Sequence, residues 1–231
     1  MEHWSGAHIA ALATTAVVAA LVVAGARKEA DAWAISVGRG LAVIILAGFV
    51  GEQLTYAVRE EWTAQVNLPL QLTDAVTFAS VAALWHPQHA LLVEVVYFWA
   101  LSASVQAVVT PDVGEPFPDP LFISYFATHS GAIIAACLLV FGARRRLRPG
   151  AVWRVYAITA AFAVVAAAGT LVTGGNYMFL RRKPVRGSLL DLMGPWPAYI
   201  VAGAALALAM FAALDALARR ISPRETPGGA T

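Results

Sequence analysis

The sequence predicts an all-α protein, a polytopic membrane bundle of about seven transmembrane helices. Of its 231 residues, 59% are hydrophobic and 13% are charged, and the mean hydropathy is +0.68. In a soluble domain roughly a quarter of the residues are charged. The charges here fall in short connectors between long apolar runs. Because backbone polar groups in lipid have to be satisfied within one segment, each run of about 20 apolar residues is expected to form a spanning helix.

The predicted helices follow the apolar runs in order: Ala7–Ala26, Ala32–Val58, Leu68–Trp85, Gln88–Thr110, Leu121–Ala143, Ala151–Thr173 and Trp196–Arg219. The third fits the pattern least, since it is short and polar at its start. The connectors are too short to fold alone, so residues 1–221 are expected to form one transmembrane domain. Residues 222–231 contain two prolines and two glycines, and this tail is predicted to be disordered.

The distribution of lysine and arginine predicts the orientation of the bundle. With the N-terminus outside, the inner connectors and the C-terminal end hold nine basic residues and the outer connectors five, which favours an N-out/C-in arrangement in the cell membrane. The net charge of +2 is too small to indicate nucleic acid. The single cysteine, Cys137, excludes an intramolecular disulfide and a cysteine-based metal cluster.

Costly polar residues of several predicted helices fall near one depth. Counted along each helix at 1.5 Å per residue, they lie roughly 6–12 Å below the outer surface. They are Glu52, Gln53, Thr73, Asp74, Gln106 and His129, with Asn176 and Tyr177 closing the sixth helix and Asp191 preceding the seventh. An ionisable group costs about 2.5–3.5 kcal/mol at the bilayer centre, so a shared outward-facing polar cavity is expected. The alternative is that each residue caps its own helix. Glu94 lies deeper, and we expect it to pair with Arg39.

Several longer segments resemble a known membrane family. They are VTPDVGE from Val109, FISYFATHSG from Phe122 and SLLDLMGPWP from Ser188, with LPLQLTD from Leu68, YFW from Tyr97, PGAVWR from Pro149 and GNYMFLRRKP from Gly175. On these motifs the chain resembles the YwaF family of integral membrane proteins, which includes the vertebrate transmembrane protein 164, an acyltransferase acting on ether phospholipids. The resemblance covers roughly Leu68 to Pro197.

The resemblance implies a catalytic histidine and a change of nucleophile. The family's pattern at the start of the third helix reads His, Leu, Cys, Asp, whereas this chain has Gln71, Leu72, Thr73 and Asp74. The family's proposed cysteine and histidine thus correspond to Thr73 and His129. The fold also resembles that of the androgen-induced membrane hydrolases, which use a threonine and a histidine to cleave lipid esters.

These residue types predict acyl chemistry on membrane lipids. The Thr73 hydroxyl becomes a nucleophile only when a base takes its proton, and His129 is suited to that task. Asp74 or Glu52 is expected to orient the imidazole. Gln106, Asn176 and Tyr177 offer donors to an oxyanion. The basic cluster of Arg181, Arg182 and Lys183 is predicted to bind a lipid phosphate.

Structural interpretations stand beside each of these assignments. Thr73, Thr77 and Ser80 share one helical face, a spacing typical of helix packing. His129 can be a satisfied core histidine, and its neighbours Thr128 and Ser130 are alternative nucleophiles.

Other candidates favour structural roles. Cys137 is expected to be an inert thiol, and His86 with His89 a loop. The carboxylates of the loop Pro111–Pro120 favour a capped turn over a calcium site. No phosphate loop or zinc motif is present, and no metal, cofactor or protein partner is predicted.

The sequence therefore predicts a lipid-acyl hydrolase or acyltransferase. A transporter or ligand-binding protein that uses the same cavity is one alternative, and a catalytically silent family member is another.

Overall fold

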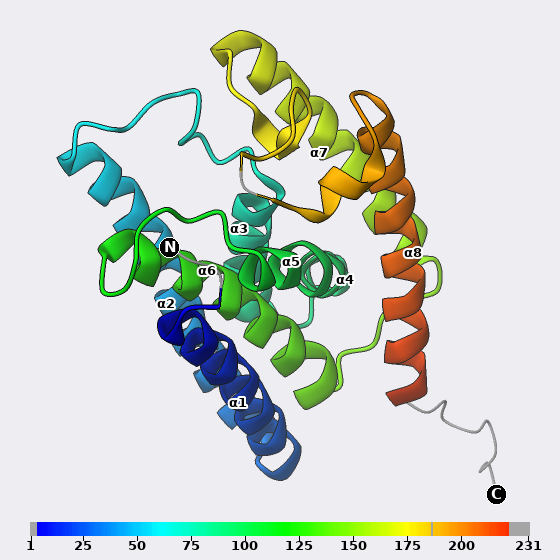
Figure 1. Ribbon diagram of the computed structural model, residues 1–231. Helices are drawn as coiled ribbons and strands as arrows, with labels where there is room; N and C mark the ends of the chain where they lie inside the picture. The colour runs from blue at the N-terminus through cyan, green and yellow to red at the C-terminus, as the bar shows by residue number, and fades with distance from the viewer. Residues whose placement is uncertain (1–3, 186, 222–231) are drawn as a thin grey trace, which may run out of the picture.

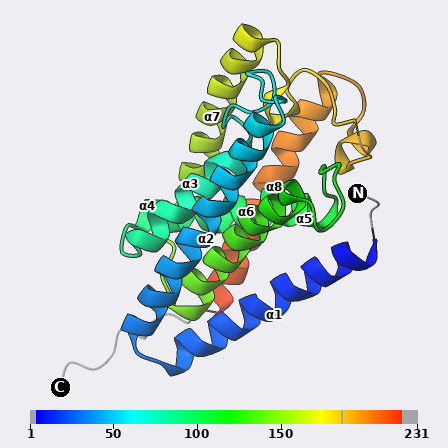
Figure 2. The same ribbon diagram turned by 90° about the vertical axis from the view of Figure 1, so that its left-hand side faces the viewer.

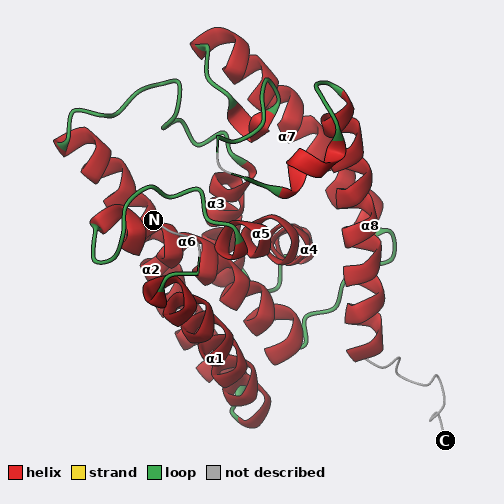
Figure 3. Cartoon of the chain, in the orientation of Figure 1, coloured by secondary structure: helices red, strands yellow, loops and turns green. Residues whose placement is uncertain are grey.

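The computed structural model describes residues 4–185 and 187–221, in which every regular element is a helix (Figure 3). Six helical segments are long and apolar enough to cross a membrane: Gly6–Lys28 (α1), Asp31–Val58 (α2), Ala90–Val109 (α4 and α5), Pro120–Gly142 (α6 and its extension), Ala151–Thr173 (α7) and Ala198–Ile221 (α8). The chain is thus a multi-pass membrane protein. The predicted tail 222–231 lies outside the described residues. The N-out/C-in orientation and the single domain stay predictions.

The third predicted helix is shorter than expected. α3 spans Leu72–Trp85, and its 14 residues cover about 21 Å, less than the roughly 30 Å of a hydrocarbon core. Residues 68–71 stay outside the helix because Pro69 interrupts the run and the Asp74 carboxylate accepts the Gln71 N–H, which caps the first turn. The bundle therefore contains six long helices and one short apolar helix.

The helices form a central group flanked on two sides (Figures 1 and 2). α2, α3, α4 and α6 pack on one another, α1 lies along α6 and its extension, and α7 packs against α8 on the other side. The outer helices expose large apolar side chains, such as Leu171 and Val172 of α7 and Val201 of α8, at 84%, 87% and 70% of their surface. Such apolar surfaces are suited to lipid rather than water.

Two of the spanning segments contain π-helical turns. α4 (Ala90–Trp99) continues through a π-helical segment, η1 (Ala100–Ser104), into α5 (Val105–Val109). α6 (Pro120–Ala136) continues into a second π-helical segment, η2 (Cys137–Gly142). Each widened turn changes which side chains face the bundle beyond it.

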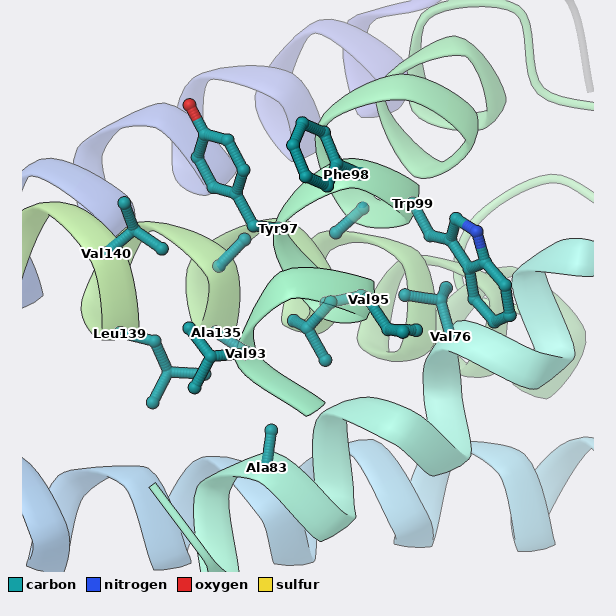
Figure 4. Packing of buried hydrophobic residues seen from close by; sticks show 14 of the residues in the cluster. Val76, Ala83, Val93, Val95, Tyr97, Phe98, Trp99, Ala135, Leu139 and Val140 are labelled. Atoms are coloured by element: carbon teal, nitrogen blue, oxygen red, sulfur yellow. The ribbon is translucent and has the colours of Figure 1, made fainter. Parts of the chain in front are cut away.

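The core lies where α4 meets α3, α6 and η2. Tyr97, Phe98 and Trp99 of α4 are almost fully buried there. Figure 4 shows them with their apolar neighbours Val76, Ala83, Val93, Val95, Ala135, Leu139 and Val140. The Tyr97 hydroxyl donates to the Leu214 carbonyl of α8 at 2.8 Å, and the Trp99 indole donates to the Thr159 hydroxyl of α7 at 2.8 Å. These bonds join the flanking pair to the central group.

α2 and α6 approach each other closely at two glycines. A Cβ on Gly48 of α2 would lie 2.9 Å from the Ala127 Cβ, and one on Gly131 of α6 would lie 2.5 Å from Cγ1 of the buried Ile45. Small residues of this kind allow helix backbones to pack closely in a membrane.

Glu94 is the one buried charge of α4, and the structure corrects its expected partner. Its side chain is 0% exposed and accepts five hydrogen bonds of 2.9–3.1 Å from Arg148 and Arg154. The predicted pairing with Arg39 is wrong, since Arg39 lies over the Trp85 ring at 5.2 Å. Arg148 precedes α7 and Arg154 lies in its first turn, so both reach the α4 carboxylate. The network fixes α7 against α4.

The α2–α6 contact predicts that an added methyl group lowers stability at Gly131 more than at Gly40. Gly131→Ala is expected to destabilise the protein by about 1–3 kcal/mol relative to Gly40→Ala, because Ile45 has no space to move. Gly40 is the matched control, since nothing lies within 4 Å of its added Cβ. Thermal unfolding in detergent checks this. Equal melting temperatures for the two variants would contradict the close contact.

Removing the Glu94 carboxylate should lower the free energy of unfolding more than removing the Asp215 carboxylate of α8. We expect Glu94→Ala to lose about 2–3 kcal/mol of stability, below the 3–5 kcal/mol of a fully buried pair, because the Arg148 and Arg154 side chains remain 47% and 37% exposed. Asp215→Ala, which breaks the Arg219 pair within α8, should cost under about 1 kcal/mol. Unfolding of both variants in one detergent gives the comparison, and similar losses would show that the Glu94 network is not special.

Candidate functional site

His129 is held in one orientation by its own helix. Its ring stacks on Tyr125 at 4.1 Å between centroids, with 19° between the planes. Its Nδ1 lies 2.8 Å from the Tyr125 carbonyl oxygen. A carbonyl only accepts, so Nδ1 carries the proton in this bond and Nε2 keeps its lone pair. A histidine in this state can act as a base through Nε2.

The two hydroxyls beside His129 are engaged by structural bonds. The Thr128 hydroxyl lies 3.1 Å from the Ser124 carbonyl, 3.0 Å from that of Tyr125 and 3.1 Å from His129 Nδ1, the nitrogen that carries the proton. The Ser130 hydroxyl is buried and accepts a 2.8 Å hydrogen bond from Thr15 of α1. The Thr128 hydroxyl thus bonds within α6 and the Ser130 hydroxyl bonds to α1. Both are less suited than a free hydroxyl to act as the nucleophile.

Thr73 lies in the first turn of α3, which packs against α6. Its side chain is half-buried, and its carbonyl accepts the Thr77 hydroxyl at 2.9 Å. Within the described residues the Thr73 hydroxyl itself makes no hydrogen bond, to His129 or to any other group. Catalytic hydrogen bonds often form only when substrate is present. The Thr73–His129 pair therefore stays a prediction.

The carboxylates of Asp74 and Glu52 lie near the same region. Asp74 accepts the Gln71 N–H at 3.0 Å, so one of its oxygens caps α3. Glu52 of α2 is close enough to interact electrostatically with Asp74 and with Tyr125. Tyr125 in turn stacks on His129. Within the described residues neither carboxylate is hydrogen-bonded to His129, so the shared outward-facing polar cavity stays a prediction.

Three predicted oxyanion donors have other hydrogen-bond partners. The Gln106 amide, on the exposed side of α5, donates to the Ser102 carbonyl and contacts the Met210 sulfur of α8. Asn176 accepts the backbone N–H groups of Arg181 and Arg182 and so shapes its loop. Tyr177 is fully buried, and its hydroxyl joins the backbone of Ala64 and Leu68. None of these bonds brings the three side chains to His129.

The basic cluster lies in the loop after α7. Arg181 donates weakly to the Gly174 carbonyl at 3.4 Å. Lys183 lies 4.0 Å from Asp191 and 5.7 Å from the Tyr199 ring centroid. Arg181 and Arg182 are exposed, so their guanidinium groups remain available to a ligand.

An ion pair joins the C-terminal end of α2, which carries Glu52, to the N-terminal end of α6, which carries His129. Arg59, which follows α2, donates to the Asp119 carboxylate at 2.7 Å, and Asp119 caps α6 by accepting the Leu121 N–H at 2.9 Å. The Arg59 guanidinium, then the Leu121 N–H, hold the pKa of Asp119 below its ordinary value. Within the described ranges no three His, Cys, Asp or Glu residues are grouped to hold a metal.

A cavity of about 450 Å³ lies at the end of the bundle opposite to the Arg59–Asp119 pair, and the sequence did not predict it. Arginines 145, 146, 219 and 220 line it. The two arginine runs were visible in the sequence. Taken separately, each run only enters the count of basic residues that predicts the orientation. The sequence does not show that the two runs meet in space.

Comparison with known proteins gives one match. The family model of the TMEM164 family matches residues 3–215. No curated protein and no solved structure matches the chain. The finer grouping with the YwaF family and the distant likeness to the androgen-induced hydrolases stay predictions.

The Arg59–Asp119 pair predicts a pH-dependent contribution to stability. Because the pKa of Asp119 is lowered in the folded protein, its contribution is complete above the ordinary aspartate value of about 3.9. It is lost as the pH falls through the lowered value. The melting temperature of Asp119→Asn should lie below that of the wild type at neutral pH, and the gap should close in acid. Glu60→Gln, which changes an exposed acid of the same connector that has no ion pair in the described residues, is the control and should leave the melting temperature close to that of the wild type.

Proposed function

We propose, because the chain belongs to the TMEM164 family, that it is a membrane enzyme that cleaves or transfers a lipid acyl chain. The catalytic pair of the proposal is Thr73 and His129. The observation that carries it is the His129 Nδ1 bond to the Tyr125 carbonyl, which leaves Nε2 as a base inside the bundle. The cell membrane is the proposed compartment, and membrane phospholipids are the proposed substrates.

Thr73 is the nucleophile that the remaining contacts favour. Its hydroxyl makes no hydrogen bond within the described residues, whereas those of Thr128 and Ser130 are engaged. The α3–α6 contact brings its helix against the one that carries His129. A buried imidazole with a fixed tautomer is suited to accept the hydroxyl proton.

The proposed reaction proceeds in two steps. The Thr73 oxygen attacks the ester carbonyl carbon while His129 Nε2 takes the hydroxyl proton. The ester C–O bond then breaks, and the leaving lipid alkoxide takes the proton back from His129. In the second step water, or the hydroxyl of another lipid, attacks the acyl-threonine carbonyl carbon while His129 Nε2 takes its proton. The bond between that carbon and the Thr73 oxygen then breaks, the Thr73 oxygen takes the proton back from His129, and a fatty acid or a new ester leaves.

The polar neighbours have supporting roles in this proposal. Glu52 and Asp74, which interact electrostatically with each other, are the proposed groups that stabilise the imidazolium, and Asp74 also caps α3. Arg181, Arg182 and Lys183 are the proposed contacts for the lipid phosphate. Asn176 and Tyr177 support the loop that carries them, in keeping with their observed bonds.

A catalytically silent family member is the second candidate. The observation that favours it is that Asp74, Asn176, Tyr177 and Lys183 all have structural partners in the described residues. In that case the wild-type chain has no acyl activity, and Thr73→Cys would have to supply the nucleophile before any activity appears.

Acyl release from a phospholipid with a fluorescent acyl chain tests the enzyme proposal. Thr73→Ala and His129→Gln should each lower the rate roughly 100-fold or more, whereas Thr73→Ser should retain activity. Thr110→Ala is the matched control, because its exposed hydroxyl bonds only to the Gln106 carbonyl. Intact-protein mass spectrometry should show an acyl adduct on Thr73. Full activity in Thr73→Ala would exclude this nucleophile.

A further inference from the structure

The cavity distant from His129 combines an apolar wall with a cationic rim. It is lined by residues of η2, of the segment before α7 and of the end of α8, and η2 packs against α8. Apolar residues and four arginines line it: Val140, Leu147, Pro149, Ala218, Arg145, Arg146, Arg219 and Arg220. Its volume of about 450 Å³ is in the range of ligand pockets.

Arg145 is positioned at this cavity by polar neighbours. Its Nη1 donates to the Gln88 oxygen at 3.1 Å, and its Nη2 lies 3.9 Å from Asp31. Its Nε is buried and has no hydrogen-bond partner in the part of the chain that the structure describes. The guanidinium is therefore held in place while one of its donors lacks an acceptor. Unsatisfied buried donors are rare in folded proteins and often indicate a missing partner.

Within the described residues, the arginines of the cavity differ in how fully they are paired with carboxylates. Arg219 pairs with Asp215 at 2.7 Å, and Asp31 is the acid nearest Arg145. Glu94 does not contribute, because Arg148 and Arg154 occupy it. Arg220 is exposed and has no ion pair within the described residues.

We propose that this cavity binds the phosphate of an anionic phospholipid. Guanidinium groups present planar pairs of donors that match phosphate oxygens. Basic pockets between the ends of transmembrane helices are suited to lipid headgroups. The apolar wall of Val140, Leu147 and Ala218 offers contact to the apolar part of such a lipid. A free phosphate would use the arginines but gain nothing from that wall.

The site is separate from the proposed catalytic pair. Val140 lies 11 residues after His129 along the same continuous helical segment, about 16 Å of helix rise away. The lipid bound there is thus not the one presented to Thr73. It fixes the ends of η2 and α8 and thereby stabilises the bundle.

Lipid binding by the full chain in detergent tests the proposal. Affinities for dioleoylphosphatidylglycerol, dioleoylphosphatidylcholine and inorganic phosphate are compared by native mass spectrometry and by thermal stabilisation. The phosphatidylglycerol should bind at least roughly tenfold more tightly than the zwitterionic lipid, and Arg145→Gln/Arg220→Gln should remove roughly tenfold of that affinity. Arg220→Gln alone should lose a smaller part without changing the fold, since its side chain is exposed.

A matched variant separates the cavity from general surface charge. Lys28→Gln/Arg144→Gln removes two cations from the same end of the bundle but outside the lining, and it should bind within roughly twofold of the wild type. An equal loss in both double variants would overturn the site. Equal stabilisation by inorganic phosphate would overturn the lipid assignment. Neither result depends on the Thr73–His129 proposal, because no acyl activity is measured.

Discussion

The close contact between α2 and α6 is the interaction on which the rest of the bundle depends. α6 meets α1, α2, α3 and the π-helical segment η1, and it is mostly buried. Gly48 and Gly131 allow its backbone to approach α2 to a distance that a methyl group would prevent. In lipid no hydrophobic driving force favours helix association, so such close packing supplies much of the stabilising energy. The same contact brings Glu52 within electrostatic range of Tyr125, the residue that stacks on His129.

Charge in this bundle is handled in two different ways. Glu94 is wholly buried, yet its five hydrogen bonds satisfy both carboxylate oxygens and fix α7 against α4. Of the arginines around the cavity at the same end, Arg219 pairs with Asp215, whereas Arg220 has no ion pair within the described residues. A buried charge costs much less free energy when it is paired and fully hydrogen-bonded, whereas an incompletely paired cluster beside a cavity is available to an anionic ligand. These two arrangements distinguish a structural network from a binding surface.

The candidate catalytic region shows how one side chain can serve structure and chemistry. Asp74 caps α3 through one oxygen and still lies in electrostatic range of Glu52. His129 is fixed by stacking on Tyr125 and by a backbone hydrogen bond, which is the preorganisation that a base requires. Tyr177 and Asn176 instead organise the loop between α7 and α8 through hydrogen bonds with the backbone. A transfer reaction in this region therefore rests on α3 and α6 more than on that loop.

The fold class could be predicted from the sequence, because lipid requires long apolar helices and leaves a clear pattern of hydropathy. Depth along a helix can also be counted, and the shared level of Glu52, Asp74 and His129 stays a prediction made in that way. The pairing of charged groups could not be predicted, because it depends on how the helices pack. Glu94 joins Arg148 and Arg154 rather than Arg39, and the arginines after α6 meet those at the end of α8. Helix rotation and packing distance decide such contacts, and both depend on side chains from helices far apart in the sequence.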